Sequence, residues 1–334
     1  MRHNGRGAPL WSPMDEPQSG KGTPGGAPES DLPQVEVLLS TFNGETFLRE
    51  QLDSLIDQDW PNLSVLARDD GSTDGTCAIL EEYRHRMNLR WYTGHNLGLA
   101  QSFFDLARNA SPGAAYYAFC DQDDVWLPNK VSVAVRSLRQ WEDPAQPCAY
   151  GCRSVIVNER LQRLPFRHQW GTLKPSFGNA IAQCILQGCC TVINGALRRE
   201  LVDHAPGYAI THDWWIYLVA TGVGRVFIDP ESHLLYRQHG ANVLGRRSMF
   251  GRFHKYRMLY RLYGRDHAMH RQAREFARLY QARLDAKDAR LMDIYLNYRQ
   301  GFAPRLRLVF NRAIGRMQLW DDLLWRAACL LDML

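Results

Sequence analysis

Four short apolar runs alternate with four segments of helical periodicity in the first half of the chain. The apolar runs cover residues 35–39, 63–67, 89–92 and 114–120. The helical segments cover residues 48–56, 76–87, 99–106 and 131–138. Because strands that return to one sheet through a helix form right-handed crossovers, this alternation predicts a mostly parallel sheet flanked by helices. The fold class is therefore predicted as α/β.

Polar clusters follow three of these predicted strands. They cover residues 41–44, 69–72 and 121–124, with the one-letter sequences TFNG, DDGS and DQDD. Ligands of parallel α/β sheets bind beyond the carboxyl ends of the strands. We therefore expect the three clusters to converge on one crevice and to form the functional site.

The third cluster carries the most specific chemistry. Asp121, Asp123 and Asp124 place three carboxylates in four positions, directly after a buried strand. Such carboxylates repel one another unless a cation lies between them, and their oxygens suit Mg²⁺ or Mn²⁺, above all where substrate phosphates complete the coordination. The alternatives are a solvated acidic turn for this cluster and an Asx-turn with a helix cap for residues 69–72.

Composition narrows the function classes. The net charge of +5 is too small to indicate nucleic acid by itself, and the sequence contains neither GxGxxG after the first strand nor GxxxxGK[ST]. The eight cysteines form no CxxC pair, which favours buried free thiols in a reducing compartment. Since no uncharged, strongly apolar run of about 18 residues and no N-terminal signal core is found, we predict a cytoplasmic protein.

Three regions are predicted along the chain. Residues 1–33 are rich in Gly, Pro and Ser and indicate a disordered tail, residues 34–245 form the catalytic domain, and residues 246–334 form a basic, amphipathic helical region. The last region has two interpretations. It either contacts anionic inner-membrane lipid as a peripheral surface, or packs as a helical appendage on the catalytic domain or a partner subunit.

The second half of the catalytic region is less regular. We predict a hairpin from residues 148–157 and 161–164, a strand or loop at 188–194, an apolar helix opening at 211–215 and a short strand at 226–228.

Several motifs resemble those of family 2 glycosyltransferases with the GT-A fold. The resemblance rests on residues 37–44, 69–74, 96–98 and 119–126. Residues 187–189, 212–215 and 236–239 are similar to the bacterial rhamnosyltransferase-like branch of that family. The resemblance implies a GT-A fold, with a mixed, mostly parallel sheet flanked by helices and a helical C-terminal appendage.

The resemblance also implies roles for individual residues. Nucleotide and donor contacts fall on Thr41, Asn43, Asp69, Asp70, Asn96 and Asp121. Metal binding falls on Asp121, Asp123 and His239, with Mg²⁺ or Mn²⁺ as the cofactor. The catalytic base falls on Asp213. The sugar and acceptor pocket falls on Gly188, Cys189, Thr191, His212 and Trp214.

These implied roles suit sugar transfer from a nucleotide diphosphate. A divalent cation stabilises the charge that develops on the diphosphate, and a carboxylate removes the proton of the incoming hydroxyl. The tryptophans beside Asp213 would raise its pKa by desolvation and offer stacking faces for sugar. The alternatives are a helix cap for Asp213 and a structural hydrogen-bonding histidine for His239.

The expected activity is inverting transfer of a sugar, with rhamnose from dTDP-rhamnose favoured, to a glycan or lipid-linked acceptor in cell-surface polysaccharide synthesis. The QxxRW motif of processive synthases is absent, which favours single-sugar transfer. Three alternatives remain. The first is a nucleotidyltransferase, although no Gly-rich basic loop follows the first strand, and the second is a non-catalytic sugar-nucleotide-binding partner. The third is a nucleic-acid-binding protein that acts through the Arg/Tyr-rich C-terminal region; because it leaves the Asp clusters unexplained, we expect no nucleic acid.

Overall fold

The structure is a computed structural model that describes residues 32–141, 143–165, 174–240 and 267–333. The chain divides into two compact units, Met1–Leu32 and Pro33–Leu334, and the described helices and strands belong to the second. Residues 1–31 of the predicted disordered tail and residues 246–266 of the predicted basic, amphipathic helical region lie outside the described part of the chain.

The described residues contain an eight-stranded sheet in the order β3-β2-β1-β4-β7-β6-β8-β5. Its parallel part consists of β1 Val35–Thr41, β2 Leu63–Asp69, β3 Leu89–Thr93 and β4 Tyr116–Asp121. β1 is buried along almost its whole length, as expected for a strand with helices on both faces. Since β1 lies between β2 and β4, the three polar clusters follow adjacent strands, as the α/β prediction requires.

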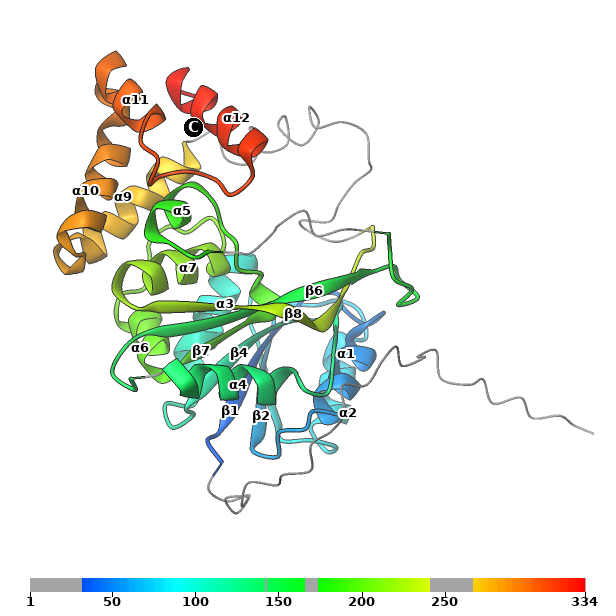
Figure 1. Ribbon diagram of the computed structural model, residues 1–334. Coiled ribbons are helices and arrows are strands. Elements are labelled where there is room, and N and C mark those ends of the chain that lie inside the picture. The colour runs from blue at the N-terminus through cyan, green and yellow to red at the C-terminus, as the bar shows by residue number, and fades with distance from the viewer. Residues whose placement is uncertain (1–31, 142, 166–173, 241–266, 334) are drawn as a thin grey trace, which may run out of the picture. The chain divides into compact units, whose positions relative to one another are not determined.

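Helices connect the parallel strands where helical periodicity predicts them. They are α1 Leu48–Ile56, α2 Thr76–Tyr83, α3 Leu99–Asn109 and α4 Lys130–Trp141. α2 ends earlier than the predicted 76–87, and its N-cap residue is Gly75, which has no side chain to cap the helix. Figure 1 shows α4 in front of the sheet and α3 behind it.

The second half completes the sheet and its helical layer. The strands are β5 Val125–Trp126, β6 Cys148–Val157, β7 Thr191–Asn194 and β8 Arg225–Arg237. The helices are α5 Phe177–Ala182, α6 Gly195–Asp203 and α7 His212–Val223, with a 3₁₀ turn at Gly188–Cys190. α3, α6 and α7 contact one another, and their apolar residues form much of the buried core. The predicted hairpin reduces to a single bridge between Val157 and Arg163.

The strand predicted at 226–228 is present but was predicted too short, because β8 extends over 13 residues. It pairs in parallel with β6, and the register shifts near Cys152, so that Asp229-Pro230-Glu231 bulges out of the ladder. A proline and two acidic residues normally end a strand, but a bulge accommodates them. The extension carries Tyr236 and Arg237 to the carboxyl end of β4.

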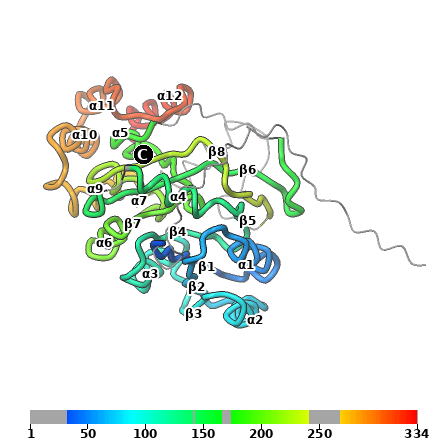
Figure 2. Tube along the Cα trace, turned by 60° about the horizontal axis from the view of Figure 1, so that its bottom comes forward, coloured from blue at the N-terminus to red at the C-terminus, as the bar shows by residue number. Residues whose placement is uncertain are grey.

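Within the described residues 267–333, four α-helices form the C-terminal region that the fold prediction anticipated. They are α9 Ala268–Tyr280, α10 Ala286–Asn297, α11 Phe302–Val309 and α12 Leu319–Leu330, with 3₁₀ turns at Gln281–Arg283 and Tyr298–Gln300. α9 packs on α7 and α10 packs on α5. The ring of Phe276 stacks on Tyr280 and meets Trp215 of α7 edge-on. The tube in Figure 2 follows the same order, with α11 and α12 adjacent. Among the described helices, none is long and apolar enough to cross a membrane.

Candidate active site

The loop after β2 is shaped by the carboxylate of Asp69. Thr41 donates from its hydroxyl to Asp69 Oδ1 at 3.1 Å, and the backbone N–H groups of Gly71 and Ser72 donate to Oδ2 at 3.0 and 2.8 Å. Gly71 has a φ of +82°, a left-handed conformation that favours glycine. Asp69 is fully buried, so its negative charge holds this loop against the end of β1. This is the Asx-turn that the sequence offered as an alternative.

Asp70 points to the other side of the loop and is buried against Arg68. The two side chains form an ion pair, and Ser102 also donates from its hydroxyl to Asp70. Arg68 binds Asp105 as well, with 3.0 Å between Nε and Oδ2. The sequence pattern does not distinguish Arg68 from other strand residues, although it neutralises one of the two predicted nucleotide-binding carboxylates.

Asn43 and Asn96 form turns at the same edge of the sheet. Asn43 has a φ of +48°, and its Oδ1 accepts a hydrogen bond of 2.9 Å from the N–H of Thr73. Oδ1 of Asn96 accepts a hydrogen bond of 2.9 Å from the N–H of Gly98. Both asparagines are exposed, so they remain accessible where strands β1 and β3 end.

Gln122 joins the loop after β4 to the loop after β1. The N–H of Phe42 donates to Oε1 at 2.8 Å, and Nε2 donates to the carbonyl of Phe42 at 3.0 Å. A Cβ added to Gly44 would overlap Oε1 of Gln122, so glycine leaves the space that the Gln122 amide occupies. Gln122 was not predicted as a site residue; its place between carboxylates in the DQDD sequence is the one signal that points to it.

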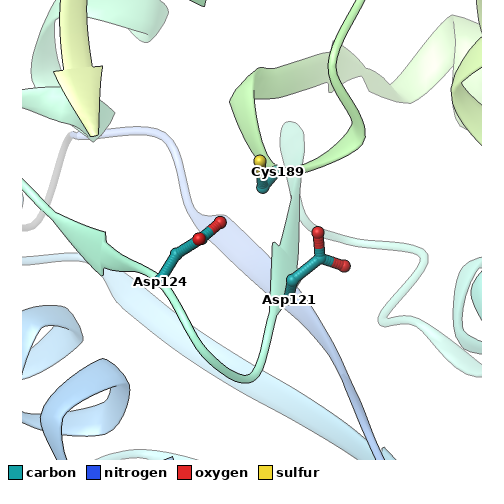
Figure 3. A group of neighbouring side chains, drawn as sticks. All are labelled: Asp121, Asp124 and Cys189. Carbon is teal, nitrogen blue, oxygen red and sulfur yellow. The ribbon is translucent and has the colours of Figure 1, made fainter. Parts of the chain in front are cut away.

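The three carboxylates of the β4 cluster separate into two groups. One ligand atom each from Asp121, Asp124 and Cys189 lie within 4.8 Å of one another, and Figure 3 shows the Asp124 carboxylate extending toward Cys189 and Asp121. Asp123 turns away, and its Oδ2 lies 2.7 Å from Nε2 of His239. The predicted ligands Asp121, Asp123 and His239 are thus near neighbours, but the tightest group contains Asp124 and Cys189.

Burial and the charges of neighbouring carboxylates make Asp121 and Asp124 hard to ionise. Burial, followed by the charges of Asp123 and Asp213, raises the pKa of Asp121 to about 7. Burial and the charges of Asp123 and Asp121 raise the pKa of Asp124 well above its ordinary value. Oδ2 of Asp124 is buried without a hydrogen-bond partner among the described residues. A cation would remove both the repulsion and this unpaired oxygen, so the donor set fits a divalent metal.

The turn before β7 brings Cys189 to the cluster. Thr191 is fully buried and donates from its hydroxyl to the carbonyl of Gln187 at 2.7 Å, which fixes this turn. A Cβ placed on Gly188 would lie 2.5 Å from Nε2 of His212. Gly188 therefore allows the imidazole ring to pack directly against the turn.

His212 opens α7 as a neutral, apolar-packed ring. Its centroid lies 4.0 Å from that of Phe103 and 5.3 Å from that of Phe119. Neither ring nitrogen has a hydrogen-bond partner among the described residues, and burial lowers the pKa of His212 to about 4. At neutral pH this side chain therefore adds no charge beside Asp213.

Asp213 of the HDWW sequence interacts electrostatically with the carboxylate cluster. Its charge contributes to the raised pKa of Asp121, which places the two groups within electrostatic reach. The N-cap of α7 is Thr211, so Asp213 lies in the first turn, where the helix dipole favours a negative charge. Trp214 is buried and donates from Nε1 to the carbonyl of Ala180 at 2.7 Å, and the structure places it in the core.

The end of β8 supplies two residues that sequence reasoning did not assign. Arg237 has no exposed surface. Its side-chain Nε donates to the carbonyl of Asp123 at 2.7 Å, and its backbone N–H donates to Asp124 Oδ1 at 3.0 Å. Burial, followed by the charges of Cys189 and Asp121, raises the pKa of Tyr236, so its phenol belongs to the same electrostatic environment. Both residues belong to the 236–239 motif, but their roles were not predicted because the length of β8 was underestimated.

Comparisons with known proteins show the family to which the chain belongs. Residues 36–205, about half of the chain, match the profile described as "Glycosyl transferase family 2". The chain belongs to this family. The membership identifies the protein as a glycosyltransferase, and the matched segment includes the strand-end clusters of β1, β2 and β4 together with the Cys189 turn.

Three curated relatives of this glycosyltransferase are distant in sequence. The dTDP-rhamnosyl transferase RfbG of Shigella flexneri is 26% identical over 62% of this chain and 73% of its own length. An uncharacterized glycosyltransferase of Rickettsia typhi is 22% identical over 63% of this chain and 65% of its own length. A putative teichuronic acid biosynthesis glycosyltransferase, TuaG of Bacillus subtilis, is 28% identical over 48% of this chain and 62% of its own length.

The fold is also similar to a solved glycosyltransferase structure. S. aureus TarS, residues 1–349 in complex with UDP-GlcNAc, superposes with a TM-score of 0.52, covering 89% of this chain and 90% of that one. At 15% identity this likeness shows the fold alone, which confirms the GT-A prediction.

Proposed function

We propose that this glycosyltransferase is a metal-dependent, inverting enzyme that moves one sugar from a nucleotide diphosphate sugar to an acceptor hydroxyl. The observation that carries the proposal is that two different elements, β4 and α7, supply carboxylates that interact electrostatically. Asp121 is the last residue of β4, and Asp213 lies in the first turn of α7, close enough for its charge to raise the pKa of Asp121. Direct displacement needs one acidic group that binds a metal at the diphosphate and another that accepts a proton from the acceptor.

Asp121, Asp123 and His239 are the proposed metal-binding residues, and the structure supports adding Asp124 and Cys189 to the candidates. A bound divalent cation would neutralise the negative charge that develops on the diphosphate leaving group. Carboxylate oxygens suit Mg²⁺ and Mn²⁺ equally, whereas a thiol in the group favours Mn²⁺, the softer of the two.

The nucleoside is proposed to bind at the ends of β1, β2 and β3. Asn43 and Asn96 are exposed there, and their amide groups can contact a base or ribose. Thr41, Asp69 and Asp70 are buried and bonded to protein groups, which supports a role in shaping this edge and presenting its backbone to the nucleotide.

Asp213 is proposed to accept the proton of the acceptor hydroxyl. The pocket on this side is proposed to contain Gly188, Cys189, Thr191, His212 and Trp214. Of these, Cys189, Thr191, His212 and Trp214 are buried, and the last three would act by fixing the position of the turn before β7 and the first turn of α7.

Rhamnose from dTDP-rhamnose is the proposed donor sugar, supported by the 26% identity to a dTDP-rhamnosyl transferase. The proposed acceptor is a glycan or a lipid-linked glycan used for cell-surface polysaccharide. A lipid-linked acceptor would place the enzyme in the cytoplasm, at the inner face of a membrane.

A thermal-shift panel tests the proposal. UDP, dTDP, GDP and CDP are each added with and without Mn²⁺ to the wild-type protein, to Asp123→Ala and to Asp203→Ala, an exposed control at the end of α6. We expect one nucleotide to raise the melting temperature only with Mn²⁺, in the wild type and the control but not in Asp123→Ala. Stabilisation by no nucleotide, or equal stabilisation of Asp123→Ala, would reject the metal–diphosphate site.

A further inference from the structure

Large exposed apolar side chains gather on the last two helices of the chain. They are Phe302, Phe310, Leu319, Trp320, Leu323, Leu324, Leu331 and Met333, exposed by 38% to 77%. Elsewhere in the described residues, only Phe42 and Ile56 are large, apolar and exposed to this degree. Soluble surfaces seldom leave so many apolar groups together without a binding partner. We call this set the α11–α12 face.

α12 is apolar on both of its sides. Trp325 and Cys329 are buried against the rest of the protein, which accounts for one side. Trp320, Leu324 and Leu331 follow helical spacing on the opposite side, and all are exposed. Figures 1 and 2 show α12 beside α11 at the end of the helical region, in agreement with the contacts between them.

The charges around this face are unbalanced toward positive. Asp322 is paired with Arg326, and Asp332 is paired with Arg299 and Arg305. The third acidic residue of the segment, Asp321, is partly buried in the first turn of α12.

Two arginines of the same segment remain available to a partner. Arg307 in α11 and Arg312 after it are exposed, and neither forms an ion pair with a described residue. An apolar face with unpaired arginines in the same segment complements a surface that has an anionic outer layer and an apolar interior.

We propose that the α11–α12 face is a membrane-binding surface that inserts its apolar side chains among lipids with anionic headgroups. Tryptophan and arginine are both suited to the boundary between headgroups and acyl chains, where one end of the side chain is apolar and the other is polar. The proposal deepens the proposed function, on which it rests for the lipid-linked acceptor, but lipid binding itself is measured without turnover.

The dimensions of α12 place it in the plane of the membrane surface. Its 12 residues span about 18 Å at the α-helical rise, well short of the hydrocarbon thickness of about 30 Å. A second copy of the chain is a less favourable occupant than lipid. A two-fold contact through this face would bring the unpaired arginines of both copies together.

Flotation with lipid vesicles tests the proposal on the full-length protein. Vesicles of phosphatidylcholine alone are compared with vesicles that contain phosphatidylglycerol. One variant, Trp320→Ser with Leu324→Ser, removes apolar contacts, and a second, Arg307→Gln with Arg312→Gln, removes charge. Ile56→Ser is the matched control, because it removes an exposed apolar side chain at the end of α1.

We expect the wild type and the control to bind anionic vesicles and to bind neutral vesicles weakly. The arginine variant should lose about fivefold in partition for each removed charge, and the apolar variant at least about tenfold on either vesicle. Each variant must keep the wild-type melting temperature. If the apolar variant is destabilised, the surface arginine variant still tests the proposal.

Two results would overturn the proposal. One is equal partition of the wild type and both variants. The other is a wild-type dimer in sedimentation that dissociates in the Trp320→Ser, Leu324→Ser variant while vesicle binding is absent. Because nucleotide-dependent thermal shifts are measured separately on the same proteins, failure of lipid binding is distinguishable from failure of the proposed sugar-transfer site.

Discussion

Nε2 of His239 lies 2.7 Å from Oδ2 of Asp123, so two residues predicted as separate metal ligands bind each other. The ring of Phe47 packs against His239 with 4.9 Å between centroids, which restricts the orientation of the imidazole. The contact joins the end of β8 to the loop after β4. His239 is therefore positioned to orient the Asp123 carboxylate, whether or not it also reaches the cation.

The substitution His239→Ala should weaken Mn²⁺ binding by about tenfold, because a side chain that orients a ligating carboxylate contributes on this scale. Binding of the nucleotide without metal should change little. Electron paramagnetic resonance of free Mn²⁺ gives the affinity directly. His85→Ala removes an exposed imidazole on the far end of α2 and serves as the control. Unchanged Mn²⁺ affinity in His239→Ala would remove His239 from the site.

The substitution Asp213→Asn should lower kcat by roughly 10²- to 10⁴-fold, since an amide cannot accept the proton of the acceptor hydroxyl. KM for the donor should stay close to that of the wild type, because the proposed role of Asp213 is with the acceptor hydroxyl and not with the nucleoside. Initial rates with the donor identified by thermal shift provide the measurement. Asp203→Asn, at an exposed site, should behave as wild type. Full turnover by Asp213→Asn would refute its role as the base.

The parallel half of the fold was predictable because its signals are local. Each strand from β1 to β4 is an apolar run with a polar cluster or turn at its end, and each helix shows its own periodicity. Parallel strands joined by crossovers end at the same edge of the sheet, so the convergence of the three clusters was predictable, whereas the order of the strands was not.

The antiparallel half depends on partners that a local pattern does not reveal. β8 continues through Pro230 because its residues 229–231 bulge out of the pairing with β6, and β6 is more than 70 residues away in sequence. The positions of Tyr236 and Arg237 follow from that pairing. The burial of His212 and Trp214 likewise results from packing of α7 on α3 and α5. Residues of one short motif therefore belong partly to the core and partly to the candidate site.

The raised pKa of Asp121 predicts a pH-dependent stability in cation-free buffer. The pKa is about 7 in the folded protein and 3.8 without burial, so between these values the folded state holds a proton that the unfolded state has released. Stability from this group is therefore present at low pH and lost as pH rises through about 7. The free energy of unfolding should decrease between about pH 5 and about pH 8, by an amount on the order of 2 to 4 kcal/mol for this group.

Urea unfolding of the wild type and Asp121→Asn at both pH values isolates this contribution. The wild type should lose more stability than the variant on going to the higher pH, because asparagine does not titrate. Mn²⁺ should reverse the trend, since a cation binds the deprotonated carboxylate and gains affinity as pH rises. Identical pH profiles for the two proteins would show that the Asp121 proton is not bound more tightly on folding.

Arg237 links the cluster to the surrounding fold, and its removal should be costly. Besides its bonds to the Asp123–Asp124 loop, Nη2 donates to Glu50 at 2.6 Å, and the guanidinium lies 4.5 Å from the centroid of the Phe47 ring.

The substitution Arg237→Met keeps most of the volume but leaves buried carbonyls without donors, so unfolding free energy should fall by about 3 kcal/mol. Urea titration measures the loss. Arg160→Met, at an exposed position, is the matched control and should change stability by less than about 0.5 kcal/mol. Glu50→Gln should cost less than about 1 kcal/mol, because the Glu50 side chain is half exposed. Mn²⁺ affinity should fall with Arg237→Met and not with Arg160→Met, because Arg237 positions the backbone of Asp123. A stable Arg237→Met protein with normal Mn²⁺ affinity would show that the loop after β4 holds its shape without this arginine.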